Sequence, residues 1–484
     1  MRMKDFYITT TIPYVNAPPH LGFALELVQA DTLARHQKAL DKKVFFNTGT
    51  DEHGLKIFQA AKKQNKHPQK YVNEYAAKFG RLGPALNLSY NNFIRTTDPH
   101  HCRAAREFWR RCQKNGDIYQ AKQKIKYCVG CEMEKTDSEL VKDRCPLHPN
   151  KKLIFLKEKN YFFRFSRYQK RLLQLYEENP DFIIPRHRLK EIKNFVGRGL
   201  RDFSISRLKK KLSWGIEVPG DKNQVMYVWF DALINYISAL GWPQDKKKFQ
   251  RWWPGIQVAG KDNLRQQTAI WQAMLMSAGL PNTRQVLIHG FITANGRKMS
   301  KSLGNVINPF ALVKKYGTDP LRYYLLKEIP PTKDGDFTEK HFQEVYNADL
   351  ANGLGNLIQR VAVLCQNLPP NLIIGMRSHL SYKIFLNKKK RKKYRYFLEN
   401  YQFNRALAWI WKKAASLDKY INQVKPWEKK GKELEEVLTK PIKEILTISL
   451  LLKPFLPETS KKIKLIFEDK KVKAPTKPLF PRVK

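Results

Sequence analysis

The sequence predicts an α/β fold built on a parallel sheet, with an insertion inside it and an all-helical region after it. A β-rich run, a helical pattern and a second apolar run follow one another at residues 6–10, 21–39 and 44–46. Strand, helix and strand in this order begin a βαβ unit, in which ligands bind at the carboxyl ends of the strands. The α/β pattern stops near residue 116 and returns near residue 224, which indicates one discontinuous domain that carries an insertion.

The remaining elements follow the interruption. The returning α/β part contains the apolar runs VMYVWFDAL at 225–233, IQVAGKD at 256–262 and QVLIHGF at 285–291. We expect the first and the last of them to be strands that end in polar loops. Beyond them, apolar residues recur three and four apart, the spacing of buried faces in a helix bundle. They are Leu350, Leu354, Leu357, Val361 and Leu364, and then Phe403, Leu407, Ile410, Ala414, Leu417 and Ile421.

The composition limits the kinds of protein that this chain can be. Its 484 residues include 90 Lys plus Arg and 43 Asp plus Glu, a formal charge of +47. Such an excess favours a nucleic-acid partner, because Lys and Arg on phosphates release counterions, although a lysine-rich proteome would also produce it. Seven basic residues fall in 388–395, which we expect to be an exposed loop or a solvated helix end. With no secretory signal, no apolar run of ~18–20 residues and too few cysteines for a disulfide framework, we expect a cytoplasmic protein without a membrane span.

Two short motifs, far apart in the chain, have the chemistry of a nucleotide site. The first is PPHLGFA at 18–24, where His20 stands between a predicted strand and a predicted helix. A helix N-terminus attracts anions, an imidazole adds an N–H donor, and Gly22 lets a flat base or sugar approach. The second is NGRKMSKSLGN at 295–305, a lysine-, serine- and glycine-rich loop suited to phosphate. Either motif alone would be ordinary, as a surface histidine or a basic loop.

Together and in this order, the two motifs resemble the HIGH and KMSKS motifs of class I aminoacyl-tRNA synthetases. The resemblance extends over nearly the whole chain, because further segments match the methionyl-tRNA synthetase family in order. They are TIPYVN, TGTDEHG, YVWFDAL, AGKD, KMSKSLGNV, DPLRYYLL and VKPW. The family implies activation of methionine by ATP, bound with Mg²⁺, to methionyl-adenylate, followed by transfer of the methionyl group to tRNA(Met).

The resemblance also divides the chain. In order, the expected parts are the first half of a Rossmann-like class I synthetase catalytic domain (1–115), an inserted zinc-bearing connective domain (116–223), the second catalytic half (224–292), a KMSKS-loop region that contacts the tRNA stem (293–346), an all-α anticodon-binding bundle (347–466) and a tail (467–484). Some family members continue into a dimer-forming module that has no counterpart in this sequence, so we expect a monomer.

The reaction of the family depends on placement more than on acid–base chemistry. The carboxylate that attacks the α-phosphorus of ATP is already ionised at pH 7, so orientation and a cationic cradle for the phosphates remain to be supplied. By resemblance, the catalytic residues are His20, Lys298 and Lys301. The implied ATP-binding residues are His20, Gly22, Phe23, Lys298, Ser300 and Lys301.

The resemblance implies two further sets of binding residues. Asp51 would bind the α-ammonium group of the amino acid, and aromatic faces would suit the polarizable thioether of methionine. The implied pocket residues are Ile12, Tyr14, Asp51, Trp229, Tyr236, Asn263 and Gln267. Asn356 and Arg360, four apart on one helix face, would read the anticodon together with Trp427. Without the family match, Trp229 and Tyr236 would read as core residues and Trp427 as packing for a helix end.

Four residues of the insertion have the spacing of a metal knuckle. YCVGC and CPLH supply Cys128, Cys131, Cys145 and His148, with two residues between the ligands of each pair. This spacing suits tetrahedral Zn²⁺, and four protein ligands leave no open position, so the predicted site is structural. Unligated cysteines are the alternative, and the family's own knuckle in its inserted domain favours zinc.

The sequence departs from the family at three positions. Phe23 takes the place of the second His of the first ATP motif and cannot donate to a phosphate. Asn263 and Gln267 stand where the family usually has an aliphatic residue and a His. Gln267 can still bond a neighbouring phenol or a backbone group, whereas the amide of Asn263 would need a partner of its own. These departures leave two alternatives open: a class I synthetase for another amino acid, and a catalytically impaired tRNA-binding paralogue.

Overall fold

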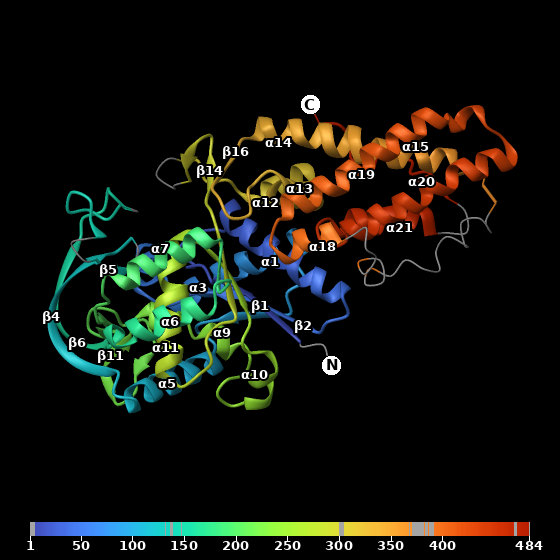
Figure 1. Cartoon of the computed structure of the whole chain (residues 1–484). Helices are drawn as coiled ribbons and strands as arrows, with labels where there is room; N and C mark the ends of the chain where they lie inside the picture. The colour runs from blue at the N-terminus through green and yellow to red at the C-terminus, as the bar shows by residue number, and fades with distance from the viewer. Residues whose placement is uncertain are drawn as a thin grey trace.

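The computed structural model describes residues 5–130, 132–135, 139–146, 148–299, 304–366, 368–369, 382, 386, 392–468 and 472–483. An α/β part contains the N-terminus, and an elongated helical part extends from one side of it (Figure 1). Helix α1 (Leu21–Ala39) of the first part contacts α13 (Thr318–Lys327), which leads into the second. Among the described residues, no helix is both long and apolar enough to cross a membrane.

A six-stranded parallel sheet forms the centre of the α/β part. Its order is β3-β2-β1-β12-β13-β7, and each neighbouring pair runs parallel. The strands are β1 (Phe6–Thr10), β2 (Val44–Thr50), β3 (Asn92–Arg95), β7 (Ile183–Ile184), β12 (Ile256–Gly260) and β13 (Gln285–His289). β1, β2 and β12 are buried along their whole length, because helices cover both faces of the sheet. The strands predicted at 6–10, 44–46 and 285–291 are confirmed.

Helices connect and cover these strands. α1 joins β1 to β2 over the predicted residues, and most of its side chains are buried because it packs against the sheet and against α13. The other helices of the α/β part are α2 (Leu55–Lys63), α3 (Pro68–Gly80), α4 (Leu82–Ala85), α5 (Pro99–Lys114), α6 (Gln169–Glu178), α7 (Arg186–Gly197), α8 (Val228–Ala232), α9 (Asn235–Ser238), α10 (Lys246–Trp252) and α11 (Trp271–Ser277).

Most of the strands of the predicted insertion form sheets of their own. β4 (Ile118–Cys128) and β6 (Ile154–Phe163) make a long antiparallel pair that curves away from the rest of the molecule (Figure 1). β5 (Met133–Glu134) and β8 (Phe203–Ser204) flank this pair. A second sheet has the order β10-β11-β9, built from β9 (Ser206–Leu208), β10 (Glu217–Val218) and β11 (Asp221–Met226).

Two features of this region differ from the sequence prediction. β7 lies inside 116–223 yet pairs with β13, so the chain returns to the main sheet before residue 223. A two-residue edge strand has too little periodicity to be seen in a sequence. The strand predicted at 225–233 is also wrong, because β11 ends at Met226 and the buried helix α8 follows at Val228. Its aromatic and β-branched residues favour strands, and tertiary packing overrides that preference.

The helical part follows a small sheet of order β15-β14-β16, which contains β14 (Ile292–Ala294), β15 (Arg297–Lys298) and β16 (Gly335–Phe337). Its helices are α12 (Pro309–Tyr316), α13, α14 (Glu339–Val345), a π-helical stretch (Tyr346–Gly355), α15 (Asn356–Leu364), α18 (Lys392–Glu399), α19 (Phe403–Val424), α20 (Gly431–Leu452) and α21 (Pro457–Glu468). Both predicted apolar stripes face the core of the bundle. Residues 388–391 of the basic run lie outside the described residues. The rest of that run begins α18, where Lys392 and Lys393 are exposed, as expected of a solvated helix end, while Tyr394 is buried in the bundle.

One buried arginine ties the helical part to the α/β part. Arg322 of α13 pairs with Asp31 of α1 at 2.8 Å. Its Nε donates to the carbonyl of Phe455, between α20 and α21, at 2.7 Å, and its Nη1 donates to the carbonyl of Leu86 at 3.0 Å. The arginine of the DPLRYYLL segment therefore fixes how the two parts meet.

Candidate active site

The entrance of α1 holds the histidine of the first motif. His20 caps the helix, with its Nδ1 accepting the backbone N–H of Gly22 at 3.1 Å. Since Nδ1 is the acceptor, the neutral ring carries its proton on Nε2, which leaves one N–H donor for an anion. Local desolvation lowers the pKa of His20 although its side chain reaches solvent, so the neutral form is present at neutral pH.

The second motif lies against the first. Met299 of the KMSKS segment comes within 3.8 Å of the position that a Cβ would take at Gly22. The N–H of Leu21, the first residue of α1, donates to the carbonyl of Ile307 at 3.1 Å. Residues from the KMSKS segment and from the chain just after it therefore border the start of α1.

The described part of that loop presents one of the predicted lysines. Lys298 is exposed at the end of β15, and its carbonyl accepts from Nδ2 of Asn305 at 3.2 Å, which closes the base of the loop. The predicted residues Ser300 and Lys301 lie outside the described residues. The imidazole of His20 and the N-terminus of α1 therefore lie beside the segment that carries Lys298, an arrangement suited to a polyphosphate.

Phe23 turns away from this place. It is 9% exposed, and its ring meets that of Phe79 on α3 edge-on, with centroids 5.7 Å apart. The aromatic side chain that replaces a motif histidine is therefore accommodated by packing in the core.

Asp51 lies directly after β2, one strand away from β1 and the His20 segment. Its N–H donates to the carbonyl of Pro13 at 2.9 Å, and its carbonyl accepts the N–H of Val15 at 3.2 Å. Burial raises the pKa of the Asp51 carboxyl well above its ordinary value, and the neighbouring acids Asp231 and Glu132 raise it further. The pocket thus holds a buried acid whose strongest electrostatic neighbours are other acids.

Aromatic rings border this acid. Tyr14, which pairs through its backbone with Asp51, meets Trp229 edge-on with centroids 6.1 Å apart. Tyr236 is 2% exposed, and Nε2 of Gln267 donates to its hydroxyl at 2.6 Å. Of the two partners expected for Gln267, a neighbouring phenol or a backbone group, the structure shows the phenol. Ile12, Tyr14 and Trp229 pack against the same hydrophobic cluster that contains Tyr236.

The second amide behaves differently. Asn263 follows β12, is only partly buried, and points its Nδ2 at Oδ1 of Asp262, 3.4 Å away. The partner that its amide needs is therefore a neighbouring carboxylate.

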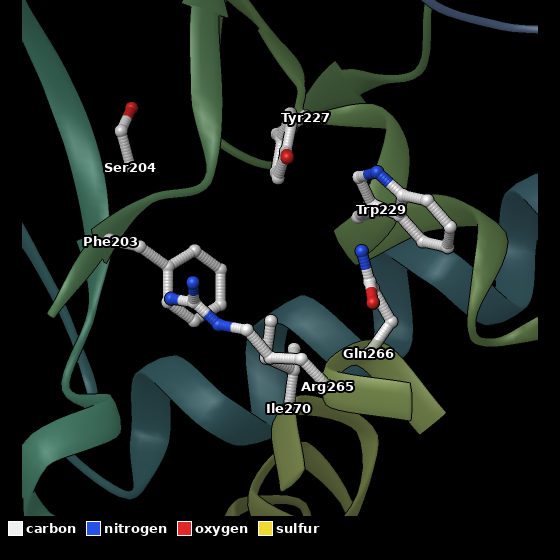
Figure 2. Close-up of a pocket in the computed structure, with 7 residues that line it drawn as sticks. All are labelled: Phe203, Ser204, Tyr227, Trp229, Arg265, Gln266 and Ile270. Carbon is white, nitrogen blue, oxygen red and sulfur yellow. The ribbon is translucent and has the colours of Figure 1, made fainter. Parts of the chain in front are cut away.

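A small cavity lies behind Trp229. Figure 2 shows the indole of Trp229 and the amide of Gln266 on one side, Phe203 and Ser204 on the other, and Tyr227 between them at the top. It leaves about 20 Å³ of free space, room for about one water molecule, so an amino acid side chain would need these residues to move.

Two buried networks support the site, and the sequence analysis missed both. The carboxylate of Asp231 bonds Nδ1 of His53 at 2.6 Å and Nε2 of His101 at 2.7 Å, which fixes α8 against the loop after β2. Beside the start of α1, Glu26 bonds Nε2 of His289 at 2.9 Å and the hydroxyl of Thr11 at 2.6 Å. An acid within an apolar helix is the signal that could have revealed Glu26.

The knuckle residues approach one another in the insertion. Nδ1 of His148 lies 3.9 Å from Sγ of Cys128 and 4.0 Å from Sγ of Cys145, while Cys131 lies outside the described residues. Two ligands of a tetrahedral Zn²⁺ stand about 3.5 Å apart, so the donor set fits zinc with a small contraction. A Cβ at Gly130 would lie 2.3 Å from Cγ of His148, so only glycine admits the ring. Burial and nearby lysines lower the pKa of His148 to about 4, which favours the neutral, ligating imidazole.

Comparisons with known proteins cover nearly the whole chain. The family model described as tRNA synthetases class I (M) matches residues 6–154 and 149–362. Methionine–tRNA ligase of Thermotoga maritima is 41% identical over 482 residues, which cover 96% of this chain and 76% of that protein. The chain belongs to the methionine–tRNA ligase family. The methionine–tRNA ligase of a Synechocystis strain is 43% identical over 485 residues, 95% of this chain and 89% of that protein.

Solved structures of methionyl-tRNA synthetases have the same fold. The Mycobacterium tuberculosis enzyme in complex with methionyl-adenylate is 34% identical, with a TM-score of 0.88 over 99% of this chain and 100% of that one. Its apo form is 31% identical, with a TM-score of 0.81 over 100% of this chain and 99% of that one. The class I synthetase fold, with its parallel sheet and helical C-terminal region, is thus confirmed.

The residues that this family resemblance assigns to the anticodon gather at one end of the helical part. Asn356 is exposed at the start of α15, and one turn later Arg360 pairs with Asp418 of α19 at 2.7 Å. Trp427, 53% exposed, stands just after the end of α19. The alternative that Trp427 packs a helix end is disfavoured by this exposure.

Proposed function

We propose that the chain activates methionine with ATP to form methionyl-adenylate and then transfers the methionyl group to tRNA(Met). The observation that carries the proposal is Asp51, a buried acid that pairs with no cation among the described residues and lies one strand from the helix entrance capped by His20. An amino acid supplies the missing cation through its α-ammonium group, and its carboxylate then points toward the nucleotide.

The protein's contribution to the reaction is placement and charge. Nε2–H of His20 and the first N–H groups of α1 hold phosphate oxygens, and Lys298 and Lys301 bring positive charge from the KMSKS loop. ATP enters with Mg²⁺ on its phosphates, which neutralises charge on the leaving pyrophosphate. No general base is assigned, because the attacking carboxylate is ionised at neutral pH.

The remaining assignments belong to the same proposal. Cys128, Cys131, Cys145 and His148 hold one structural Zn²⁺ that fixes the knuckle, within an inserted connective domain. Asn356, Arg360 and Trp427 read the anticodon, since amide, guanidinium and indole groups suit unpaired bases. A cytoplasmic location suits cysteines that must stay reduced, and a monomer stays a prediction that sedimentation would check.

Exchange of labelled pyrophosphate into ATP, measured with each of the twenty amino acids, tests the function. Methionine alone should support exchange, and zinc analysis should find about one ion per chain. Trp427→Ala should lower charging of tRNA(Met) and leave exchange unchanged, because the adenylate forms far from the bundle. Exchange with another amino acid but not with methionine would refute the proposal.

A further inference from the structure

A second carboxylate reaches the amino-acid pocket from the insertion. Glu132 lies between β4 and β5 and is completely buried, with a positive φ of 50°. Its Oε1 accepts the backbone N–H of Lys56, in the first turn of α2, at 2.7 Å. Its own carbonyl accepts the hydroxyl of Tyr227. Contacts at both the main chain and the side chain therefore hold the carboxylate in one place.

The other oxygen of this carboxylate has no hydrogen-bond partner in the part of the chain that the structure describes. Oε2 of Glu132 is buried and makes no hydrogen bond of good geometry to a described residue, and the same holds for the hydroxyl of Tyr14. The two groups nevertheless lie close together, since Lys56 and the Tyr14 hydroxyl both act to lower the pKa of Glu132, against the larger effect of burial, which raises it. A Cβ at Gly54 would lie 2.9 Å from Oε2, so the glycine of TGTDEHG keeps the space beside it open. A buried carboxylate oxygen without a donor costs free energy, which indicates that a ligand supplies the donor.

The ligand chemistry follows from the neighbours. Glu132 is close enough to Asp51 and to Tyr14 to act on both electrostatically. An ammonium group has three N–H donors and no acceptor, so one acid cannot satisfy it. We infer that Glu132 is a second binding residue for the α-ammonium group of the amino acid, with Oε2 accepting one N–H while Asp51 accepts another. This inference rests on the proposed function and adds to it a residue from the insertion.

The test compares two ligands that differ only in the ammonium group. The probes are the sulfamoyl analogue of methionyl-adenylate and the same molecule without its α-amino group, each titrated by calorimetry. Glu132→Gln should weaken the first probe roughly 10- to 150-fold, the range for a hydrogen bond to a charged group, and the second by less than about threefold. The amide oxygen can still accept the Lys56 N–H, so the fold should persist.

A matched control and a second variant complete the experiment. Glu217, partly exposed on β10 of the insertion and paired with Lys209, provides Glu217→Gln, which should change neither affinity. Glu132→Asp keeps the charge and should recover part of the affinity for the ammonium probe, with circular dichroism to check folding. Equal losses for both probes would show a purely structural role and overturn the inference. Failure of the unaltered protein to bind the first probe would instead overturn the proposed function.

Discussion

Two clusters of buried charge differ in a way that separates structure from function. At the junction of α1 and α13, Asp31 pairs with Arg322 at 2.8 Å and with Arg35 at 2.7 Å. In the amino-acid pocket, Asp51 and Glu132 are equally buried, yet the strongest electrostatic neighbours of Asp51 are acids. The first cluster is complete within the protein. In the second, Lys56 lies near Glu132, but no ion pair joins Asp51 to a cation among the described residues.

The titration of the two aspartates shows the same difference. Burial alone would raise the pKa of Asp31, but the guanidinium groups of Arg322 and Arg35 hold it below its ordinary value. Burial raises the pKa of Asp51, and Asp231 and Glu132 add to the shift. A chain tolerates an uncompensated buried acid where a ligand brings the opposite charge, so the incomplete cluster marks the binding site.

Breaking the complete cluster should produce the largest loss of stability. Arg322→Met removes the cation from Asp31 and the donors from the carbonyls of Phe455 and Leu86. The free energy of unfolding should fall by about 3–5 kcal/mol, the usual cost of leaving a buried charge unpaired. Denaturant unfolding measures this, with Arg35→Met, at a partly exposed partner of Asp31, as the milder control. A loss below about 1 kcal/mol would contradict the assignment.

Removing Asp51, the acid without a paired cation among the described residues, should lower activity without lowering stability. Asp51→Asn takes away the partner of the substrate ammonium. The transition state should lose about 2–5 kcal/mol of stabilisation, so kcat/KM for methionine-dependent exchange should fall at least roughly 30-fold. The melting temperature should stay the same or rise, because the acids lose mutual repulsion. Glu52→Gln is the matched control, since Glu52 binds Arg95 at 2.6 and 2.8 Å and should lose stability. Destabilisation by Asp51→Asn comparable to that by Glu52→Gln would show that Asp51 stabilises the fold and does not serve as the ammonium site.

The bond between Gln267 and Tyr236 allows a smaller test. Gln267→Leu leaves the buried Tyr236 hydroxyl without its donor. The binding free energy of methionine should weaken by about 1–3 kcal/mol, which raises KM. Gln267→His, the residue usual in the family, keeps a donor and should change KM by less than about threefold. Steady-state exchange kinetics compare the two variants, and equal effects would show that the bond does not shape the pocket.

The pH dependence of stability should have opposite signs in the two clusters. The folded pKa of Asp51 is raised, so ionisation opposes folding, and Asp51→Asn should stabilise the protein at neutral pH with a gain that vanishes as pH falls toward 4. The folded pKa of Asp31 is lowered, so Asp31→Asn should destabilise at neutral pH, with a loss that shrinks as pH falls below about 4. Each pKa unit corresponds to about 1.4 kcal/mol, which unfolding curves at several pH values resolve. Shifts of the same sign would remove the distinction.

The sequence predicted the elements whose pattern is local. α1 begins at Leu21 and ends at Ala39 as its periodicity indicates, and the stripe from Phe403 to Ile421 is buried along α19. The chemistry of its amide predicted that Gln267 bonds a phenol or a backbone group, and the structure identifies the phenol of Tyr236 as the partner.

What the sequence could not predict depends on contacts between distant segments. β7 has two residues and exists because β13 lies beside it, and the strand-like run after Met226 folds as a helix because α8 packs inside the core. Glu132 directly follows Cys131, a predicted zinc ligand, so its position in the sequence indicated a place in the metal-binding loop and not in the pocket. Its place beside the pocket emerges only when the insertion folds back onto α2.

Proton release on methionine binding, measured by calorimetry in buffers of different ionisation enthalpy, tests the central claim most directly. If Asp51 gains a cation from the substrate, its raised pKa must fall, and binding should release a fraction of a proton at pH values above about 4, the ordinary pKa of an aspartate. Asp51→Asn should abolish that release. Binding of methionine without proton release across this range would contradict the claim that the uncompensated acid is the ammonium site.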